Sequence, residues 1–310
     1  MNDPSGPSTA SSEGLRWERR PEGLHEPVLV ATFEGWNDAA DAASSAGTWL
    51  TQHGTAVKIA SIDPEVHLDF QARRPQAEIV GGVAKAIVWP RQEFFQCRFG
   101  DHDLVVLRGL EPSYRWRAHC ALVLEVARET GCRMVVTLGA LLADVPHTRP
   151  PRVTGSSTDR ALSERLGLEP SRYEGPTGIV GVLNDACRHE PLPALSLWAP
   201  VPHYISAPPN PPAQLALLER FAALLDVELD LARLAVTAAA WREKVDEVAR
   251  RDPEVASYVE KLEEAYDLDA GGRVTGDEQT ADQHEANAER LAAELEEFLR
   301  EELGGDEGPG

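Results

Sequence analysis

The 310-residue sequence predicts an α/β fold, with a mostly parallel sheet covered by helices on both faces and a helical extension at the C-terminus. Three observations support this fold class. Short runs rich in Val and Leu, typical of buried parallel strands, recur between residues 27 and 201. Amphipathic helical patterns alternate with these runs, as parallel strands joined by crossover helices require. After Leu229 the strand-like runs stop, and the remaining apolar residues follow helical spacing only.

The first strand is expected over residues 27–33, a continuous apolar run that ends at Gly35. Asn37 or Asp38 can cap the helix that follows, because a short polar side chain there accepts hydrogen bonds from the free amides of the first turn. Further short strands are expected over residues 57–62, 66–70, 86–89, 93–99 and 104–107.

The next part begins with an amphipathic helix, for which Ser113 is the expected N-cap and Gly131 the end. A buried strand over residues 134–138 then ends at Gly139. A long polar connection over residues 144–157 follows, and connections of that length inside a domain are often functional. The last elements of this part are a helix capped by Thr177, a strand over 195–201 and a helix over 214–225.

The C-terminal region is expected to form two or three helices, each with one apolar stripe. Residues 231–248 and 255–266 carry apolar side chains at spacings of three and four, and a last acidic helix carries them between 291 and 299. Each stripe must pack against the α/β body, another helix or another subunit. We therefore divide the chain into a disordered lead-in (1–20), an α/β domain (21–229), an acidic helical extension (230–303) and a flexible tail (304–310).

The charge of the chain limits the partners that it can have. Its 51 acidic and 30 basic residues give a net charge of −21, whereas a protein that binds nucleic acid needs a basic surface to displace counterions. The same negative charge opposes docking to anionic lipid. No apolar run approaches the length of a membrane span and the N-terminus lacks a signal-peptide pattern, so we expect no membrane partner and a cytoplasmic location.

The motifs predict no cofactor and no metal. The four cysteines lack CxxC spacing, which predicts buried free thiols rather than a zinc site. The glycines at 175, 178 and 181 are not followed by the lysine of a phosphate-binding loop, and they do not follow a clear strand. Nucleotide-dependent chemistry therefore finds no support in the sequence, and the question of whether the chain is an enzyme stays open.

Polar motifs fall at the expected carboxyl ends of the strands, where ligands bind in open α/β sheets. Gly35 allows close backbone approach, and the expected helix N-termini after Asn37 and Thr177 offer free amides to an anion. Arginines add bidentate cations, while carboxylates and histidines can bind hydroxyl groups or move a proton. The candidate ligand cleft comprises Gly35, Trp36, Asn37, Asp38, Glu111, Arg115, Gly139, Asp144, His147, Arg149, Thr177, Gly178 and His203.

Several of these residues also have a structural interpretation. Asp38 can complement the dipole of its helix, and Glu111 can satisfy nearby backbone amides. Arg149 and Asp144 can form an ion pair that pins the long connection, and His203 can be a packed, hydrogen-bonded histidine. The two interpretations differ at the cleft, because a ligand site needs an open pocket on which Arg, Asp and His side chains converge.

Six segments of the chain resemble one known family. They are FEGWNDA (33–39), DFQARRP (69–75), GLEP (109–112), LGALLADVPHTRP (138–150), YEGPTGI (173–179) and SLWAPVPHY (196–204). Together they resemble the proteasome assembly chaperone 2 family, in its actinobacterial branch, over about residues 27–225. The resemblance implies an α/β fold similar to that of purine nucleoside phosphorylases, a helical C-terminal extension and a homotrimer. It implies no known reaction.

The sequence departs from the family pattern at two positions and at its end. Ala40 stands where glycine is expected, and Pro212 stands where lysine is expected, which removes a cation. Eukaryotic members dock on the proteasome core through a C-terminal hydrophobic–tyrosine motif, which residues 306–310 (DEGPG) do not contain.

Two hypotheses about function follow. The first is a homo-oligomeric assembly or scaffold protein, chaperone-like, whose proteasome-related partner is implied by the family. The second is an enzyme or binding protein for a nucleoside-like or anionic small molecule at the strand ends.

Overall fold

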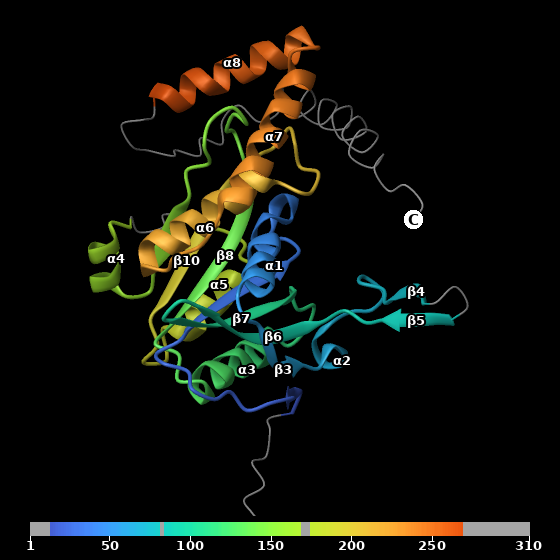
Figure 1. Cartoon of the computed structure of the whole chain (residues 1–310), viewed down its shortest axis with the longest axis vertical. Helices are drawn as coiled ribbons and strands as arrows, with labels where there is room; N and C mark the ends of the chain where they lie inside the picture. Colours follow the sequence, from blue (N-terminus) through green and yellow to red (C-terminus); the bar gives the residue numbers. More distant parts are fainter. Residues whose placement is uncertain (1–12, 81–83, 169–173, 269–310) are drawn as a thin grey trace, which may run out of the picture.

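Four parallel strands form the centre of the main sheet. The computed structural model describes residues 13–80, 84–168 and 174–268, and within them β7, β2, β8 and β10 run parallel in that order (Figure 1). Antiparallel strands extend the sheet on both sides, so that its full order is β1-β3-β6-β7-β2-β8-β10-β9. The bounds are β1 Leu15–Trp17, β2 Val28–Glu34, β3 Val57–Ile62, β6 Gln92–Phe99, β7 His102–Leu110, β8 Met134–Ala143, β9 Thr154–Ser157 and β10 Ala194–Pro202. The α/β class is confirmed, with a sheet that is mixed outside its parallel centre.

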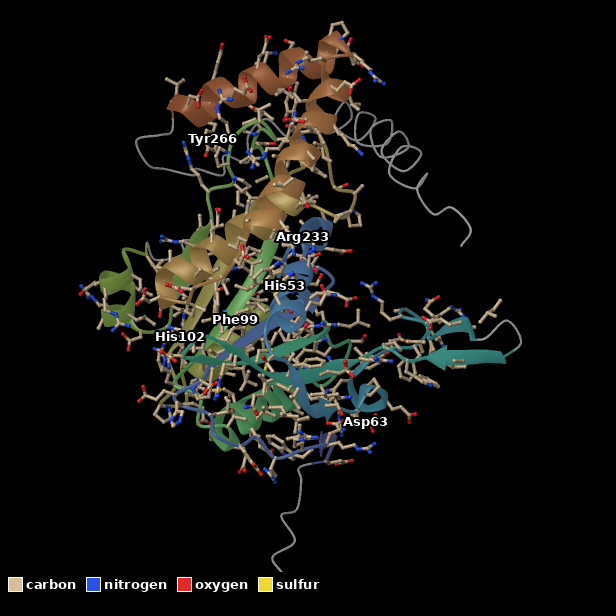
Figure 2. The ribbon with its side chains drawn as sticks, viewed as in Figure 1. His53, Asp63, Phe99, His102, Arg233 and Tyr266 are labelled. Atoms are coloured by element: carbon tan, nitrogen blue, oxygen red, sulfur yellow. The ribbon has the colours of Figure 1, made fainter. Side chains whose placement is uncertain are left out.

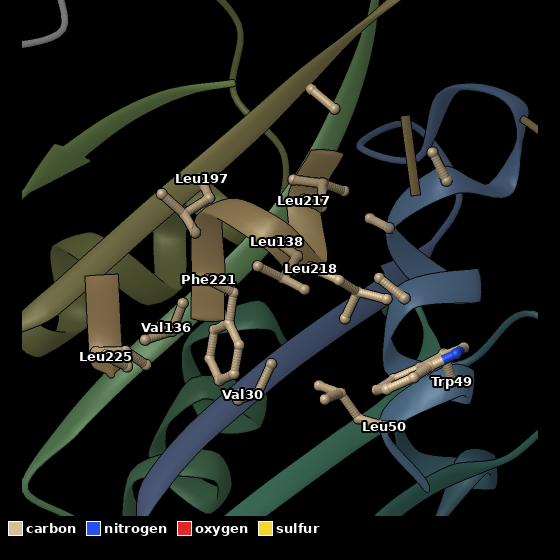
Figure 3. Close-up of a cluster of buried hydrophobic side chains, with 14 of the residues drawn as sticks. Val30, Trp49, Leu50, Val136, Leu138, Leu197, Leu217, Leu218, Phe221 and Leu225 are labelled. Carbon is tan, nitrogen blue, oxygen red and sulfur yellow. The ribbon is translucent and has the colours of Figure 1, made fainter. Parts of the chain in front are cut away.

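Helices cover both faces of this sheet. Along β2, Val30 packs on the face covered by α1 (Ala42–His53) and α6 (Pro211–Leu225), and the neighbouring Leu29 packs on the face covered by α3 (Trp116–Glu129) and α5 (Ile179–Cys187). This alternation is the period of two that a strand buried on both faces requires. Figure 3 shows the first of these two cores, in which side chains of α1 and α6 meet those of the strands.

Two further helices, α7 (Ala232–Ala249) and α8 (Pro253–Leu268), follow the α/β body. The first half of α7 packs on α6, and its second half joins α8 in a separate apolar cluster. Tyr204 and Ile205, which follow β10, complete that cluster. The apolar stripes of both helices are therefore buried within the chain itself.

A two-stranded antiparallel sheet, β4 (Gln76–Val80) with β5 (Ala84–Val88), projects from the body (Figure 1). We call β4, β5 and the following Trp89 the arm. Within the described residues neither strand pairs with the main sheet. Trp89 packs edge to face on Phe70, with ring centroids 5.1 Å apart.

The structure differs from the predicted elements at several places, and it adds β4, which the sequence does not predict. The sequence predicts a strand over residues 66–70, but α2 (Pro64–His67) forms there, because the Asp63 carboxylate accepts from the Glu65 amide (3.0 Å) and Pro64 suits a first helical turn. β8 does not end at Gly139, since its pairing with β10 continues to Ala143. β9 lies inside the expected connection over 144–157, and β1 lies inside the expected lead-in over 1–20.

Two short helices complete the described chain, η1 (Ala39–Asp41) and α4 (Arg160–Leu166), the second of which the sequence does not predict. The expected acidic helix over 291–299 and the tail over 304–310 lie outside the described residues. Across the ranges that the structure describes, none of the helices has the length and hydropathy needed to cross a membrane.

Candidate functional site

A cavity of about 1400 Å³ opens at the carboxyl ends of β2 and β8. Its floor includes the turn after β2 at residues 35–37 and the last residues of β8 at 140–142. One wall is α5, and the other is formed by β9 and α4. Of the thirteen candidate residues, Gly35, Trp36, Asn37 and Thr177 line this cavity.

A chain of hydrogen bonds forms the polar part of the cavity floor. The Asn184 side-chain amide donates to Thr137 Oγ1 (3.1 Å), and the Thr137 hydroxyl donates to Ser196 Oγ (3.1 Å). The Trp198 indole N–H also donates to Ser196 Oγ (2.9 Å). This network holds the Trp198 ring against Gly139, one of the candidate residues. Ser196 and Trp198 belong to the segment SLWAPVPHY, but the sequence analysis did not place them at the site, because they lie in the middle of a strand.

Glu111 joins the end of β2 to the start of α5. Its Oε1 accepts from the Asn37 side-chain amide (2.8 Å) and from the backbone amide of Ile179 (2.8 Å), the first residue of α5. Gly178 is the N-cap of α5, where a Cβ would lie 2.4 Å from the Asn37 side chain, so only glycine fits. Thr177 is therefore not the cap. A carboxylate already occupies the helix N-terminus at which we expected an anion.

Asp38 occupies the start of α1 in the same way. Its carboxylate accepts from the amides of Ala43 (2.6 Å) and Ser44 (3.2 Å), as a capping side chain does, although the N-cap residue of α1 is Asp41 rather than Asp38 or Asn37. Burial raises the pKa of Asp38 to about 6, against the opposing effect of these hydrogen bonds. Ala40, which stands where the family pattern has glycine, has a φ of 49°, a left-handed conformation that glycine adopts more easily.

Arg149 lies away from the cavity and binds α8. Its guanidinium donates from Nε and Nη2 to the two carboxylate oxygens of Asp267 (3.0 and 2.8 Å), and from Nη1 to Glu263 (3.1 Å). The expected partner, Asp144, lies instead 3.0 Å from Nδ1 of His203. The long connection is thus pinned by ion pairs, but its arginine is paired with the helical extension.

Further contacts fasten residues 144–152, which we call the clamp loop, to the extension. The Tyr266 side chain belongs to α8 (Figure 2). Its hydroxyl donates to the carbonyl of Pro150 (2.7 Å), and the Arg152 guanidinium stacks 3.6 Å from the centre of its ring. On the same side, the Tyr258 hydroxyl lies 3.4 Å from Nε2 of His203. His203 is therefore a packed histidine between β10 and α8.

His147, in the clamp loop, is buried and neutral. Its backbone amide donates to the Tyr204 hydroxyl (2.9 Å), and its Nδ1 lies 2.8 Å from the same oxygen. Burial lowers the pKa of His147 to about 4, although Asp246 and Glu263 act in the opposite direction. The space beside His147 and Arg149 is about 10 Å³, which is room for no more than about one water molecule.

The candidate residues thus fall into separate groups. Four line the cavity. Four others do not line it but support the elements that do: Asp38 and Glu111 bind the starts of α1 and α5, and Gly139 and Gly178 leave room for the side chains of Trp198 and Asn37. Asp144, His147, Arg149 and His203 belong to the contacts with the extension. Arg115 is the exposed N-cap of α3, in place of the expected Ser113, whose hydroxyl accepts from the Asp69 amide. The structure does not bring Arg, Asp and His side chains together on one cleft.

These features define an α/β protein whose C-terminal helices are fastened to a loop of the body. The PAC2 family model matches residues 32–249, and the chain belongs to the PAC2 family. Two solved structures are similar over 75% of this chain and 99% of their own. One is a PAC2 family protein from Streptomyces avermitilis, with 50% identity and a TM-score of 0.71. The other is a proteasome-assembly chaperone homologue from Mycobacterium tuberculosis, with 46% identity and a TM-score of 0.69.

A more distant structure shares the fold. An archaeal proteasome activator from Pyrococcus furiosus is 20% identical, with a TM-score of 0.60 over 76% of this chain and 97% of that chain. No curated protein matches the sequence. The family indicated by the six sequence segments is confirmed.

Proposed function

We propose that this chain is a homo-oligomeric assembly or scaffold protein of the cytoplasm, which acts through subunit and partner surfaces. The proposal includes a homotrimer and a proteasome-related protein as partner. Support for the partner comes from the relatives described as a proteasome-assembly chaperone homologue and as a proteasome activator. The proposal includes neither nucleic acid nor a membrane as partner, because the net charge of −21 on the chain repels both.

The observation that carries the proposal is the placement of exposed apolar side chains. On the arm, Ile79, Ile87 and Trp89 are 71%, 54% and 47% exposed. At the mouth of the cavity, Trp36 and Leu142 are 65% and 50% exposed. Single exposed apolar residues are ordinary, but groups of them mark surfaces that bind other proteins.

The alternative of a small-molecule enzyme is not favoured. Its acid and base candidates are engaged in internal contacts, since Glu111 holds α5 and Asp144 lies 3.0 Å from His203. Its candidate cation, Arg149, is paired with α8. His147 has room for about one water molecule beside it.

Under our proposal the chain keeps an α/β domain over 21–229, with a phosphorylase-like arrangement, and a helical extension over 230–303.

Two measurements test the proposal. Light scattering coupled to size exclusion is expected to give about three times the chain mass of 33.8 kDa. In the second measurement, separately purified proteasome subunits are mixed with and without the chain, and core-particle formation is followed on native gels and by peptidase activity. We expect faster assembly when the chain is present. A monomer at micromolar concentration contradicts the homo-oligomer, and unchanged assembly with no co-migration contradicts the proteasome-related role.

A further inference from the structure

We propose that the 1400 Å³ cavity binds an extended, uncharged peptide segment of a partner protein, which it recognises through the backbone amides of that segment. This inference rests on the proposed function as a protein that binds partners, and it names the surface and the chemistry that hold one. An apolar side chain of the peptide lies at the mouth of the cavity.

The floor of the cavity is a polar strip of the main sheet. Thr154 and Ser156 of β9 lie opposite Trp198 and Ser196 of β10, so the four side chains share one face of the sheet. On that same face Ala194, two residues before Ser196, belongs to the apolar cluster under α3 and α5. The sheet face thus changes from apolar to polar where it lines the cavity, as a surface that meets a polar ligand requires.

α5 turns one side toward this floor. The residues that line the cavity from this helix and its two ends recur at helical spacing, from Thr177 through Val180 and Asn184 to Arg188. The nine residues of α5 make it about 14 Å long. Four residues of extended chain, at about 3.3 Å each, have nearly the same length. A short extended segment therefore fits alongside α5.

The hydrogen-bond network of the floor offers one donor and one acceptor to a ligand. Ser196 Oγ accepts from Thr137 (3.1 Å) and from the Trp198 indole (2.9 Å), so both of its lone pairs are used and its own O–H is left to donate. The Asn184 amide nitrogen donates to Thr137 and to the carbonyl of Val180 (2.9 Å), which fixes its orientation. Its Oδ1 is buried and has no hydrogen-bond partner within the described residues. A donor and an acceptor that are both joined to Thr137 match the C=O and N–H of an amide.

A second acceptor without a partner lies at the start of α5. The Asn37 amide nitrogen donates to the Glu111 carboxylate, which can only accept, so the orientation of Asn37 is also fixed. Its Oδ1 finds no hydrogen-bond partner in the part of the chain that the structure describes, although the residue is only 1% exposed. Buried acceptors are satisfied in most proteins, and a ligand N–H would satisfy this one. The neighbouring Trp36 and the nearby Leu142 are exposed, and they form an apolar mouth for a side chain of the peptide.

Size and charge favour a peptide over a small anion. Small-molecule sites measure about 300–1000 Å³, and this cavity of about 1400 Å³ exceeds that range. Its charged lining residues are two basic and two acidic, namely Arg160, Arg188, Glu164 and Asp185. A lining without net charge gives an anion little advantage, whereas hydroxyl groups and side-chain amides satisfy the polar groups of a peptide backbone.

Selection from a phage-displayed library of random nine-residue peptides tests this inference. We expect wild-type chain to enrich peptides that share an apolar residue followed by small, uncharged residues, and calorimetry with synthetic peptides gives their affinities. Thr154→Trp places a large ring over the cavity floor from an exposed position and is expected to weaken binding by at least about tenfold. Thr237→Trp, at an exposed threonine of α7, is the matched control and should bind as wild type does.

Changes to the peptide test the recognition of its backbone. Methylation of one backbone nitrogen at a time removes a donor and leaves every side chain in place. We expect about tenfold weaker binding at one or two positions, where the N–H meets Asn184 or Asn37. With the Asn184→Leu variant, the effect of methylation at one of these positions should disappear. Circular dichroism and thermal melts check that each variant folds.

The outcomes separate this inference from the proposed function. A selection that enriches no peptide, or peptides that bind the Thr154→Trp variant as tightly as wild type, overturns the inference. Methylation effects that are small at every position also overturn it, because the backbone is then not recognised. Neither result changes the mass or the rate of proteasome assembly by which the proposed function is tested. Peptides held in the cavity by a chain that leaves assembly unchanged would support the inference and contradict the proteasome-related role.

Discussion

Two of the carboxylates at helix starts, Asp38 and Glu111, were candidates for a ligand site, and both bind backbone amides instead. Asp38 accepts from the first turn of α1, and Glu111 accepts from the first turn of α5 although it lies 68 residues away in sequence. A carboxylate there satisfies free amides and complements the helix dipole. At these two positions, carboxylates that could have bound a ligand stabilise the starts of helices instead.

The role of Glu111 can be measured directly. Glu111→Ala leaves the Asn37 side-chain amide and the Ile179 amide without their acceptor, and should lower the free energy of unfolding by about 1–3 kcal/mol. Glu111→Gln keeps an acceptor oxygen at the same place and should retain most of the stability. Urea unfolding of the three proteins checks this. Equal losses in Ala and Gln would show that the charge, rather than the acceptor, is needed.

His147 should make stability depend on pH. Its pKa is about 4 in the folded chain against an ordinary value of 6.5, so the unfolded chain binds more protons between these values. Stability should therefore fall as the pH falls from 6.5 to 4, by on the order of 3 kcal/mol. His147→Gln should remove this part of the pH dependence. Asp38 and His119 are present in both proteins, so the difference between their unfolding curves isolates His147.

At the scale of elements, local pattern predicted most strands and helices of the body. β3 matches its expected bounds, and β2, β6, β10 and α6 lie close to theirs, because their apolar runs are long and are ended by turn residues. β8 is longer than expected because it pairs with β10 past Gly139, a partner that is distant in sequence. β9 was missed for a related reason, since its polar residues form a strand only by pairing with β10.

The candidate site could be predicted only where local sequence pattern fixes the position of a residue. The placement of Gly35, Asn37 and Thr177 beside a cavity follows from their position at strand ends and helix starts. The role of Arg149 does not follow from such a rule, because its partners lie 114 and 118 residues further along the chain. A single sequence contains no local signal for a contact of that separation.

The clamp loop and α8 form a unit that Arg149 should hold together. Arg149→Ala removes both ion pairs with α8, and we expect faster hydrogen exchange across residues 253–268 with little change in the main sheet. Arg160→Ala is the matched control, because the ion pair of Arg160 with Glu164 lies within exposed α4, so that its loss should leave α8 unchanged. Unchanged exchange in the Arg149 variant would mean that the apolar cluster alone holds α8.

At the scale of the whole molecule, the buried apolar side chains of the described residues form three clusters. Two of them fill the opposite faces of the main sheet, and the third joins α7 and α8 to the segment after β10. The extension is therefore attached to the body by its own core as well as by ion pairs. The arm lies outside these clusters.

Removal of residues 273–310 should leave this arrangement intact. The described members of all three clusters precede that point, so we expect the truncated chain to unfold in one cooperative thermal transition. Its midpoint should lie within about 2–4 °C of that of the full chain, which corresponds to about 1 kcal/mol. Insoluble or molten truncated protein would instead place the C-terminal residues in the core. Scanning calorimetry of both chains makes the comparison.

The clamp loop has a consequence for the chain as it is being synthesised. Arg149 leaves the ribosome 118 residues before Asp267, and translation at about 5–20 residues per second makes this a delay of roughly 6–24 s. The α/β body is completed within that interval, when α6 emerges, and Tyr204 and Ile205 are then still uncovered by α8. Every newly made molecule thus passes through a stage with a finished sheet and an open apolar surface, which the arrival of the last helix closes.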